Sequence, residues 1–223
     1  MALEGLLFDF DGTLGDSERA HHLVWNEILA PYGVEISDAE YKRRYSGNPV
    51  PACVAMVRED YGLEVPDETL IQAKVALTRQ RFSEQPIALM AHAVETLDWA
   101  REQGLRLALI TGSGREELMP TLEHHDLAHW FEAIVTRNDV THSKPHPESY
   151  LTGLEQMQLG VDQAMALEDT HHGVQSAVAA GLEVIAIPNA YSSDHDFSAA
   201  IRVCDSLEAA RDWLQGQLPG ADG

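Results

Sequence analysis

One stretch near the N-terminus, LLFDFDGTL at positions 6–14, constrains the fold more than any other. Residues 6–8 are an apolar run typical of a strand buried on both faces. Asp9 and Asp11 follow at its end, and Gly12 then permits a sharp turn. Ligands of open α/β sheets bind beyond the carboxyl ends of the strands. Two acids placed there favour a phosphoryl-transfer site, with one carboxylate as nucleophile and the other moving protons beside a metal. The alternative is an Asp-Gly hairpin turn, but an acidic helical segment follows Gly12 where a hairpin needs a paired strand.

From residue 88 onward, helical segments alternate with short apolar runs. We expect strands at residues 105–110, 133–136, 164–167 and 183–187, separated by helices at 113–125, 147–157 and 171–180. The pattern S-G-R-E at residues 113–116 reads as a capping box for the first of these helices. Repeated strand–helix–strand units predict an α/β fold with a Rossmann-like, doubly wound, mostly parallel sheet and helices on both faces.

Residues 15–85 show no convincing strand and predict a small all-helical module. Ser17 is expected to cap a helix that runs to about residue 30, and S-D-A-E at residues 37–40 is a capping box that opens a second helix. Further helices are expected at residues 50–61 and 67–82. We therefore expect a catalytic core of residues 1–14 and 86–223, with residues 15–85 inserted after the first strand as a cap domain.

The composition limits which binding partners and which cellular compartment are plausible for this chain. The formal net charge of −21 argues against nucleic acid and anionic membranes as partners. No run of ~18 apolar residues predicts a membrane span, and no basic segment precedes an apolar one as in a secretory signal. Cys53 and Cys204 are too few for a disulfide scaffold. We expect a cytoplasmic protein, monomeric, with a dimer as the alternative.

Polar residues follow the other predicted strands at the same edge of the sheet. Thr111 follows residues 105–110, Lys144 lies in the loop after 133–136, and Glu168 and Asp169 follow 164–167. Lys144, Thr111 and loop N–H groups could hold a dianionic phosphoryl group, and two or three acids suffice for Mg²⁺. Taken singly, the threonine and the acids could be helix caps, and the lysine a solvated charge. Their convergence at one edge favours a site.

These motifs resemble those of the haloacid dehalogenase superfamily, in its phosphatase and β-phosphoglucomutase-like branch with an inserted helical cap. The resemblance covers essentially the whole chain. Its four motifs are Asp9-Phe10-Asp11-Gly12-Thr13, Thr111 after an apolar strand, Lys144-Pro145, and Glu168-Asp169 before a helix that ends in Ala179-Ala180-Gly181.

The resemblance implies a role for each motif. Asp9 would be the nucleophile that forms an aspartyl phosphate, and Asp11 would protonate the leaving oxygen and then act as base toward water. Thr111, Gly112 and Lys144 would hold the phosphoryl group. By the same resemblance, the Mg²⁺ ligands are Asp9, the backbone carbonyl of Asp11, Asp169, and Glu168 either directly or through water.

The expected cap both matches the sugar-phosphate members of that branch and departs from them. Glu18, His21 and Trp25 stand where those members carry a helix facing the substrate, although His and Trp on an apolar helical stripe are also typical of a core. Gly15 stands where the family has a larger residue, which would loosen the hinge. Gly47 is followed by N-P-V-P, with no cation to hold a second phosphate as in the mutases.

We therefore expect a Mg²⁺-dependent phosphatase that hydrolyses a small organic monophosphate, such as a sugar phosphate, through an aspartyl phosphate. The alternative enzyme is a sugar phosphomutase of the β-phosphoglucomutase type. A catalytically inactive binding homologue is a further alternative, although no key acid is missing. A dinucleotide-binding domain is disfavoured, because Gly112-Ser113-Gly114 lacks the third glycine of that fingerprint.

Overall fold

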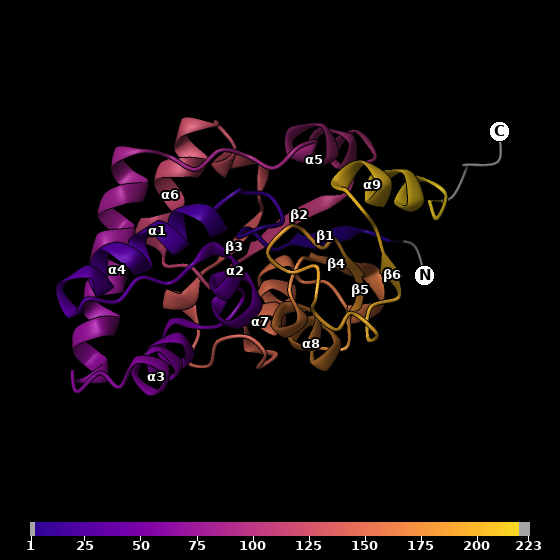
Figure 1. The fold of residues 1–223 in the computed structure, drawn as a ribbon. Helices are drawn as coiled ribbons and strands as arrows, with labels where there is room; N and C mark the ends of the chain where they lie inside the picture. Colours follow the sequence, from indigo (N-terminus) through magenta and orange to yellow (C-terminus); the bar gives the residue numbers. More distant parts are fainter. Residues whose placement is uncertain (1–2, 219–223) are drawn as a thin grey trace.

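The computed structural model describes residues 3–218, which form a central parallel sheet flanked by helices and a separate group of helices (Figure 1). The sheet has 6 strands in the order β3-β2-β1-β4-β5-β6. The strands are β1 (Gly5–Phe8), β2 (Arg106–Ile110), β3 (Ala133–Val135), β4 (Ala164–Glu168), β5 (Glu183–Ala186) and β6 (Arg202–Val203). Every neighbouring pair is parallel, and Phe8 at the end of β1 is level with Leu109 in β2 and Leu167 in β4. The strand ends therefore meet at one edge, as predicted.

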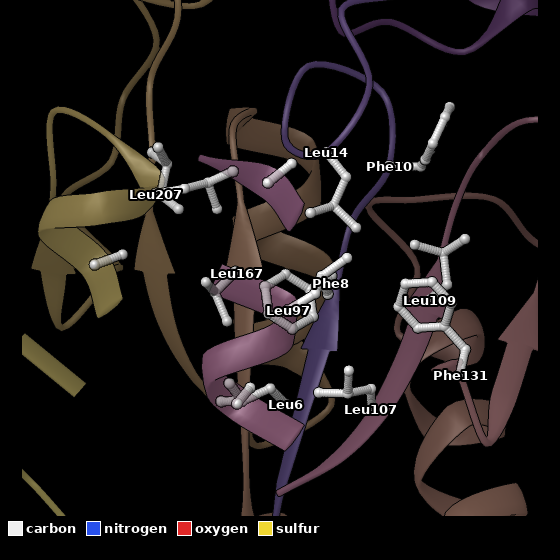
Figure 2. Packing of buried hydrophobic residues seen from close by; sticks show 14 of the residues in the cluster. Leu6, Phe8, Phe10, Leu14, Leu97, Leu107, Leu109, Phe131, Leu167 and Leu207 are labelled. Atoms are coloured by element: carbon white, nitrogen blue, oxygen red, sulfur yellow. The ribbon is translucent and has the colours of Figure 1, made fainter. Parts of the chain in front are cut away.

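Two layers of helices cover the sheet because successive side chains of a strand point to opposite faces. Leu6 and Phe8 belong to the apolar cluster under α5 (Ala93–Glu102), α6 (Arg115–His124) and α9 (Leu207–Gln215). Figure 2 shows Leu6 and Phe8 on the side of the sheet on which Leu97 from α5 lies. Leu7, between them, belongs to the cluster under α7 (Glu148–Met157) and α8 (His171–Ala179). The central strand is thus buried on both faces.

The helices of residues 15–85 have an apolar cluster of their own, which includes Trp25, Leu29, Tyr45, Val54 and Leu70. They are α1 (Glu18–Leu29), η1 (Ala30–Tyr32), α2 (Asp38–Glu40), the π-helix η2 (Tyr41–Tyr45), α3 (Val50–Tyr61) and α4 (Asp67–Glu84). Within residues 15–85, all of them described, the only strand-like pairing is a pair of isolated bridges at Gly15. We call this group the cap helices. Helix α4 packs on α6 of the sheet layer, with Arg79 Nη1 of α4 2.5 Å from Glu116 Oε2.

The chain crosses between sheet and cap helices at two points that lie side by side. The N–H of Asp16 donates to the carbonyl of Ala88 at 2.8 Å, and the N–H of Met90 donates to that of Leu14 at 2.8 Å. A Cβ at Gly15 would lie 2.6 Å from Cζ of Phe10. The aromatic ring therefore fills the space that a larger residue would take, and the crossing stays packed despite the glycine.

Two capping predictions were wrong. Ser17 occupies the N-cap position of α1 as expected, but it has helical backbone angles and makes no side-chain capping bond. Helix α6 has Gly114 as its N-cap residue, with the Glu117 carboxylate accepting the Gly114 N–H at 2.9 Å. Ser113 therefore does not cap α6, and its side chain belongs to the site described below. The capping box at residues 37–40 is confirmed in its main feature, since Ser37 accepts from the N–H of Glu40.

Three short helices join the remaining elements: η3 (Ala128–Trp130), η4 (Arg137–Asp139) and η5 (Val161–Gln163). None of the helices in residues 3–218 is both long and apolar enough to cross a membrane.

Candidate active site

A buried lysine and a buried carboxylate form the centre of the site. Asp9 is the first residue after β1 and is 5% exposed. Lys144, in the loop between η4 and α7, donates from Nζ to Asp9 Oδ1 at 2.7 Å, to Glu168 Oε1 at 2.5 Å and to the carbonyl of Ile110 at 2.9 Å. Each of the three ammonium protons therefore has a hydrogen-bond acceptor. Burial opposes the charge, but the two carboxylates outweigh it and hold the pKa of Lys144 above its ordinary value.

Asp9, Glu168 and Asp169 bring carboxylate oxygens within 4.8 Å of one another. Burial, and after it the neighbouring negative charges, raise the pKa of both Asp9 and Asp169 well above the ordinary range, although Lys144 pulls the other way. Two oxygens, Asp9 Oδ2 and Asp169 Oδ1, are buried without any hydrogen-bond partner. Unpartnered buried carboxylate oxygens are costly. A divalent cation between them would remove that cost, and a set of hard oxygen donors fits Mg²⁺.

The orientation of Asp169 is fixed from the opposite side. Asn189 Nδ2 donates to Asp169 Oδ2 at 2.7 Å and to the carbonyl of Gly12 at 3.1 Å, which leaves Oδ1 as the oxygen without a partner. Gly12 has a φ of 86°, and a Cβ there would collide with the Asp169 carboxylate. The turn after β1 therefore requires glycine for two separate reasons.

Glu168 is held differently from the other two acids. Its Oε1 accepts from Lys144 and from the hydroxyl of Tyr150 at 2.7 Å. Its Oε2 has only a long contact, 3.5 Å, from the hydroxyl of Thr170. A Cβ at Gly173, in the first turn of α8, would collide with this carboxylate. Glu168 is thus packed in place to fix Lys144, and only Oε2 is left for a direct or water-mediated metal contact.

Asp11 accepts three side-chain hydrogen bonds. Its Oδ2 accepts from Thr111 Oγ1 at 2.9 Å and from Ser113 Oγ at 2.7 Å, and its Oδ1 is 3.4 Å from His21 Nε2. Burial works to raise its pKa, but the hydrogen bonds from His21 and Ser113 outweigh burial and lower it. In this arrangement Asp11 is a carboxylate, the form required of a general base.

His21 links Asp11 to a buried cation on the cap helices. Lys74 Nζ is 3.0 Å from His21 Nδ1 and donates to Thr78 Oγ1 at 2.8 Å. Because an ammonium can only donate, Nδ1 accepts, and the imidazole then carries its proton on Nε2, toward Asp11. Lys74 is 2% exposed, and burial lowers its pKa to about 8.

A cavity of about 220 Å³ lies between the sheet edge and the cap helices. All three cap residues predicted to face the substrate line it: Glu18, His21 and Trp25. Glu18 Oε2 accepts from the hydroxyls of Tyr41 and Ser46 at 3.0 and 3.1 Å, and burial raises the pKa of this carboxyl. The cavity is also lined by Asp9, Asp11, Gly112, Lys144 and Asp169 from the sheet edge.

The structure brings together every residue predicted for the site, from five separate segments, and adds residues that the sequence analysis missed. Thr111 donates to Asp11, and Lys144, which lines the cavity, donates to Asp9 and Glu168. The missed residues are Ser113, Tyr150, Asn189 and Lys74. Of these, Asn189 had a usable signal, because it follows β5 at the same sheet edge.

Comparisons with known proteins agree with this geometry. Residues 6–187 match the model of the family described as haloacid dehalogenase-like hydrolase. Protein CbbY of Rhodobacter capsulatus is 32% identical over 98% of this chain and 100% of its own length. Fructose-1-phosphate phosphatase YqaB of Escherichia coli is 29% identical over 81% of this chain and 94% of its own length. A mutant CbbY from Rhodobacter sphaeroides, solved in complex with xylulose-(1,5)bisphosphate, superposes with a TM-score of 0.81 at 26% identity, covering 92% of this chain and 95% of that one. The chain belongs to the haloacid dehalogenase-like hydrolase family.

Proposed function

We propose that this hydrolase is a Mg²⁺-dependent phosphatase that cleaves a small organic phosphate through an aspartyl phosphate on Asp9. The observation that carries the proposal is the pair of buried, unpartnered oxygens on Asp9 and Asp169, set beside the ammonium of Lys144. When bound there, Mg²⁺ would supply the positive charge that lets a carboxylate approach a phosphate dianion. Asp9, Asp169 and the backbone carbonyl of Asp11 would hold it, with Glu168 directly or through water.

Asp9 attacks the phosphorus, and Lys144 keeps its carboxylate oriented by holding Oδ1. The bond from phosphorus to the ester oxygen breaks, and that oxygen takes a proton from Asp11. Asp11 must first gain this proton, and a phosphate dianion bound beside it would favour the protonated form by raising its pKa. Asp11, now a carboxylate, removes a proton from the water that attacks the aspartyl phosphate, and its bonds from Thr111 and Ser113 hold it in place.

The non-reacting part of the substrate would lie against the cap helices. Glu18 Oε2 is used by Tyr41 and Ser46, so Oε1 is left to accept a hydrogen bond from a substrate hydroxyl. Trp25 lines the same cavity and offers an apolar face. A carboxylate acceptor and an aromatic face in one cavity suit a polyhydroxylated, sugar-like body, and a volume of about 220 Å³ limits it to a small one.

Hydrolysis is favoured over a mutase by the segment after Gly47. Asn48, Pro49 and Val50 line the cavity and carry no positive charge with which to hold a second phosphate during isomerisation. A second candidate is removal of one phosphate from a sugar bisphosphate. It is favoured by Lys74, a buried cation that lines the cavity at the cap side, and by the CbbY complex with xylulose-(1,5)bisphosphate.

A panel of phosphorylated metabolites incubated with Mg²⁺, scored for both released phosphate and isomerised product, tests the proposal. We expect a sugar monophosphate to lose phosphate without any bisphosphate activator; preferential turnover of a sugar bisphosphate would select the second candidate. If a sugar monophosphate is isomerised faster than it loses phosphate, or if chelation of Mg²⁺ leaves the rate unchanged, the proposal is wrong.

Variants of the cap residues test the assignment of specificity. Glu18→Gln and Trp25→Phe should change the relative rates among substrates more than they change the dependence on Mg²⁺. Leu23→Ala is the matched control, because Leu23 lies on the same helix and is 59% exposed. If all three variants keep the substrate ranking of the wild type, the cap helices do not select the substrate.

We also propose that residues 15–85 move as one cap unit, because only two crossings join them to the sheet layer and α4 closes on α6. Opening would admit substrate, and closure would exclude bulk water while Asp9 is phosphorylated. A cytoplasmic location remains a proposal, supported by Cys53 and Cys204 being unpaired.

A further inference from the structure

The loop that carries Lys144 holds a second group of metal-ligating side chains outside the cavity. His142, His146 and Glu148 offer ligand atoms that lie within 4.8 Å of one another. His142 and His146 flank Lys144 in the chain, and Glu148 is the first residue of α7. The imidazole rings are 4.5 Å apart between centroids, so both histidines face the same carboxylate.

One oxygen, Glu148 Oε2, is close to both imidazoles. It is 2.8 Å from His142 Nδ1 and 3.8 Å from His146 Nδ1. In a tetrahedral site, two ligand atoms that each lie about 2.0–2.1 Å from Zn²⁺ are about 3.3 Å from each other. The two observed separations bracket that value. The side chains of His142 and His146 are 62% and 51% exposed, so each ring can turn toward an ion. Coordination would replace the contact of His142 Nδ1 with Glu148 Oε2 at 2.8 Å and the bond that His146 Nδ1 accepts from the N–H of Glu148 at 3.3 Å.

The backbone already prepares the carboxylate. Glu148 Oε1 accepts from the N–H of Thr141 at 2.8 Å, and Oε2 accepts from that of His142 at 2.9 Å. These two backbone N–H groups fix the carboxylate across the start of the loop before any ion binds.

The donor set distinguishes this group from the catalytic one. Two imidazoles and one carboxylate suit Zn²⁺ and similar divalent transition ions, whereas the three carboxylates at the sheet edge suit Mg²⁺. In the part of the chain that the structure describes, these are the two groups of at least three such side chains close enough to share an ion.

We propose that His142, His146 and Glu148 bind a divalent transition-metal ion such as Zn²⁺, and that this ion fixes the loop that presents Lys144. It would join both ends of the loop to the start of α7. A fourth position remains for water. Lys144 orients Asp9. An ion that fixes this loop would therefore affect the reaction through the position of Lys144, without touching the reacting atoms.

The test is a Zn²⁺ titration of the full chain with the catalytic site saturated with Mg²⁺, following the ring nitrogens of histidine by NMR. The signals of His142 and His146 should shift together with one saturable curve. Zn²⁺ at about 100 times its dissociation constant should also raise the Tm by roughly 5–10 °C. His142→Ala and His146→Ala should each weaken binding by at least about tenfold.

Two controls make the result decisive. His129→Ala removes another exposed histidine that pairs with a carboxylate, Asp126, at 3.4 Å, and should leave the titration unchanged. His171→Ala removes a histidine whose Nδ1 lies 2.8 Å from the carbonyl oxygen of Asp196, and should also leave the titration unchanged. Absence of a saturable shift, or binding that survives both His142→Ala and His146→Ala, overturns the proposal, as does binding lost only with His171→Ala.

Discussion

Removing Lys144 is the perturbation whose size follows most directly from the structure. Its ammonium compensates two carboxylates, and the side chains are almost fully buried: Lys144 is 11% exposed, Asp9 7% and Glu168 1%. Lys144→Met keeps the bulk of the side chain but leaves both acids without their cation. Breaking a buried ion pair from one side costs about 3–5 kcal/mol, which for a chain of this size lowers the Tm by roughly 6–20 °C.

The loss of stability caused by Lys144→Met should depend on pH in a characteristic way. The pKa of Lys144 lies above its unfolded value, so its contribution is complete below about pH 10 and is lost only as the pH rises through the folded value. The pKa of Asp9 is also raised on folding, so the folded state holds that proton more tightly and loses stability as the pH rises through the raised value. Without Lys144, the loss of stability caused by ionisation of Asp9 should be larger. The deficit of the variant should therefore be largest above neutral pH and shrink as the pH falls.

The assay is thermal unfolding of wild type and Lys144→Met without Mg²⁺, from about pH 5 to about pH 8. Lys42→Met is the matched control, because Lys42 also lies 2.8 Å from a carboxylate, that of Asp38, but these two side chains are 35% and 58% exposed; the variant should leave the Tm unchanged within error. A deficit for Lys144→Met no larger than that of Lys42→Met, or one that does not shrink as the pH falls, would refute the reasoning.

Three further predictions concern the site. Asp11→Asn should slow both phosphorylation of the enzyme and release of phosphate by about 10²–10⁴-fold; a loss under about threefold in single-turnover measurements of both steps would remove it from acid–base catalysis. Burial lowers the pKa of Lys74 to about 8, so its charge is lost as the pH rises through that value; kcat/KM should fall there, and Lys74→Met should abolish that limb of the profile. Gly12→Ala should raise the Mg²⁺ concentration needed for half-maximal rate, because its Cβ would displace the Asp169 carboxylate. Gly33→Ala, at a similar φ of 72° but with no atom within 4 Å, should cost stability without changing that concentration.

The strands that bury two apolar faces could be predicted because burial on both sides leaves continuous apolar runs. The strand expected at residues 105–110 is β2 (Arg106–Ile110), and the one at 164–167 is β4 (Ala164–Glu168). Strand β6 could not be predicted in this way: Arg202–Val203 is two residues long and exposed, and its pairing with β5 depends on the sheet already being formed.

Part of the site could be predicted from one geometric rule: the carboxyl ends of parallel strands meet at the same edge of the sheet. Asp9, Thr111 and Asp169 follow strands whose ends meet, so a parallel sheet brings them together whatever else the chain does. Lys74 escapes that rule because its place depends on how α4 packs between the other cap helices and α6. With partners on several sides, α4 shows no single apolar face in the sequence, and nothing local marks Lys74 as buried.

Ser113 shows a different limit. Its position before α6 fits a helix cap, but in the structure the N-cap residue is Gly114, whose N–H donates to Glu117, and the Ser113 hydroxyl donates to Asp11. Both arrangements satisfy the local pattern. The choice between them depends on Asp11, which is about a hundred residues away in the chain and is itself placed by β1.

The most direct test of the proposed mechanism is to trap the phosphoryl group on the protein. Enzyme in excess is mixed with a substrate labelled at phosphorus in the presence of Mg²⁺, quenched with acid within one turnover, digested, and analysed by mass spectrometry. The expected result is a phosphorylated peptide with the group on Asp9, formed and lost within the turnover and absent in Asp9→Asn. Release of phosphate at the wild-type rate by Asp9→Asn, or a turnover in which no phosphoryl group ever resides on Asp9, would contradict it.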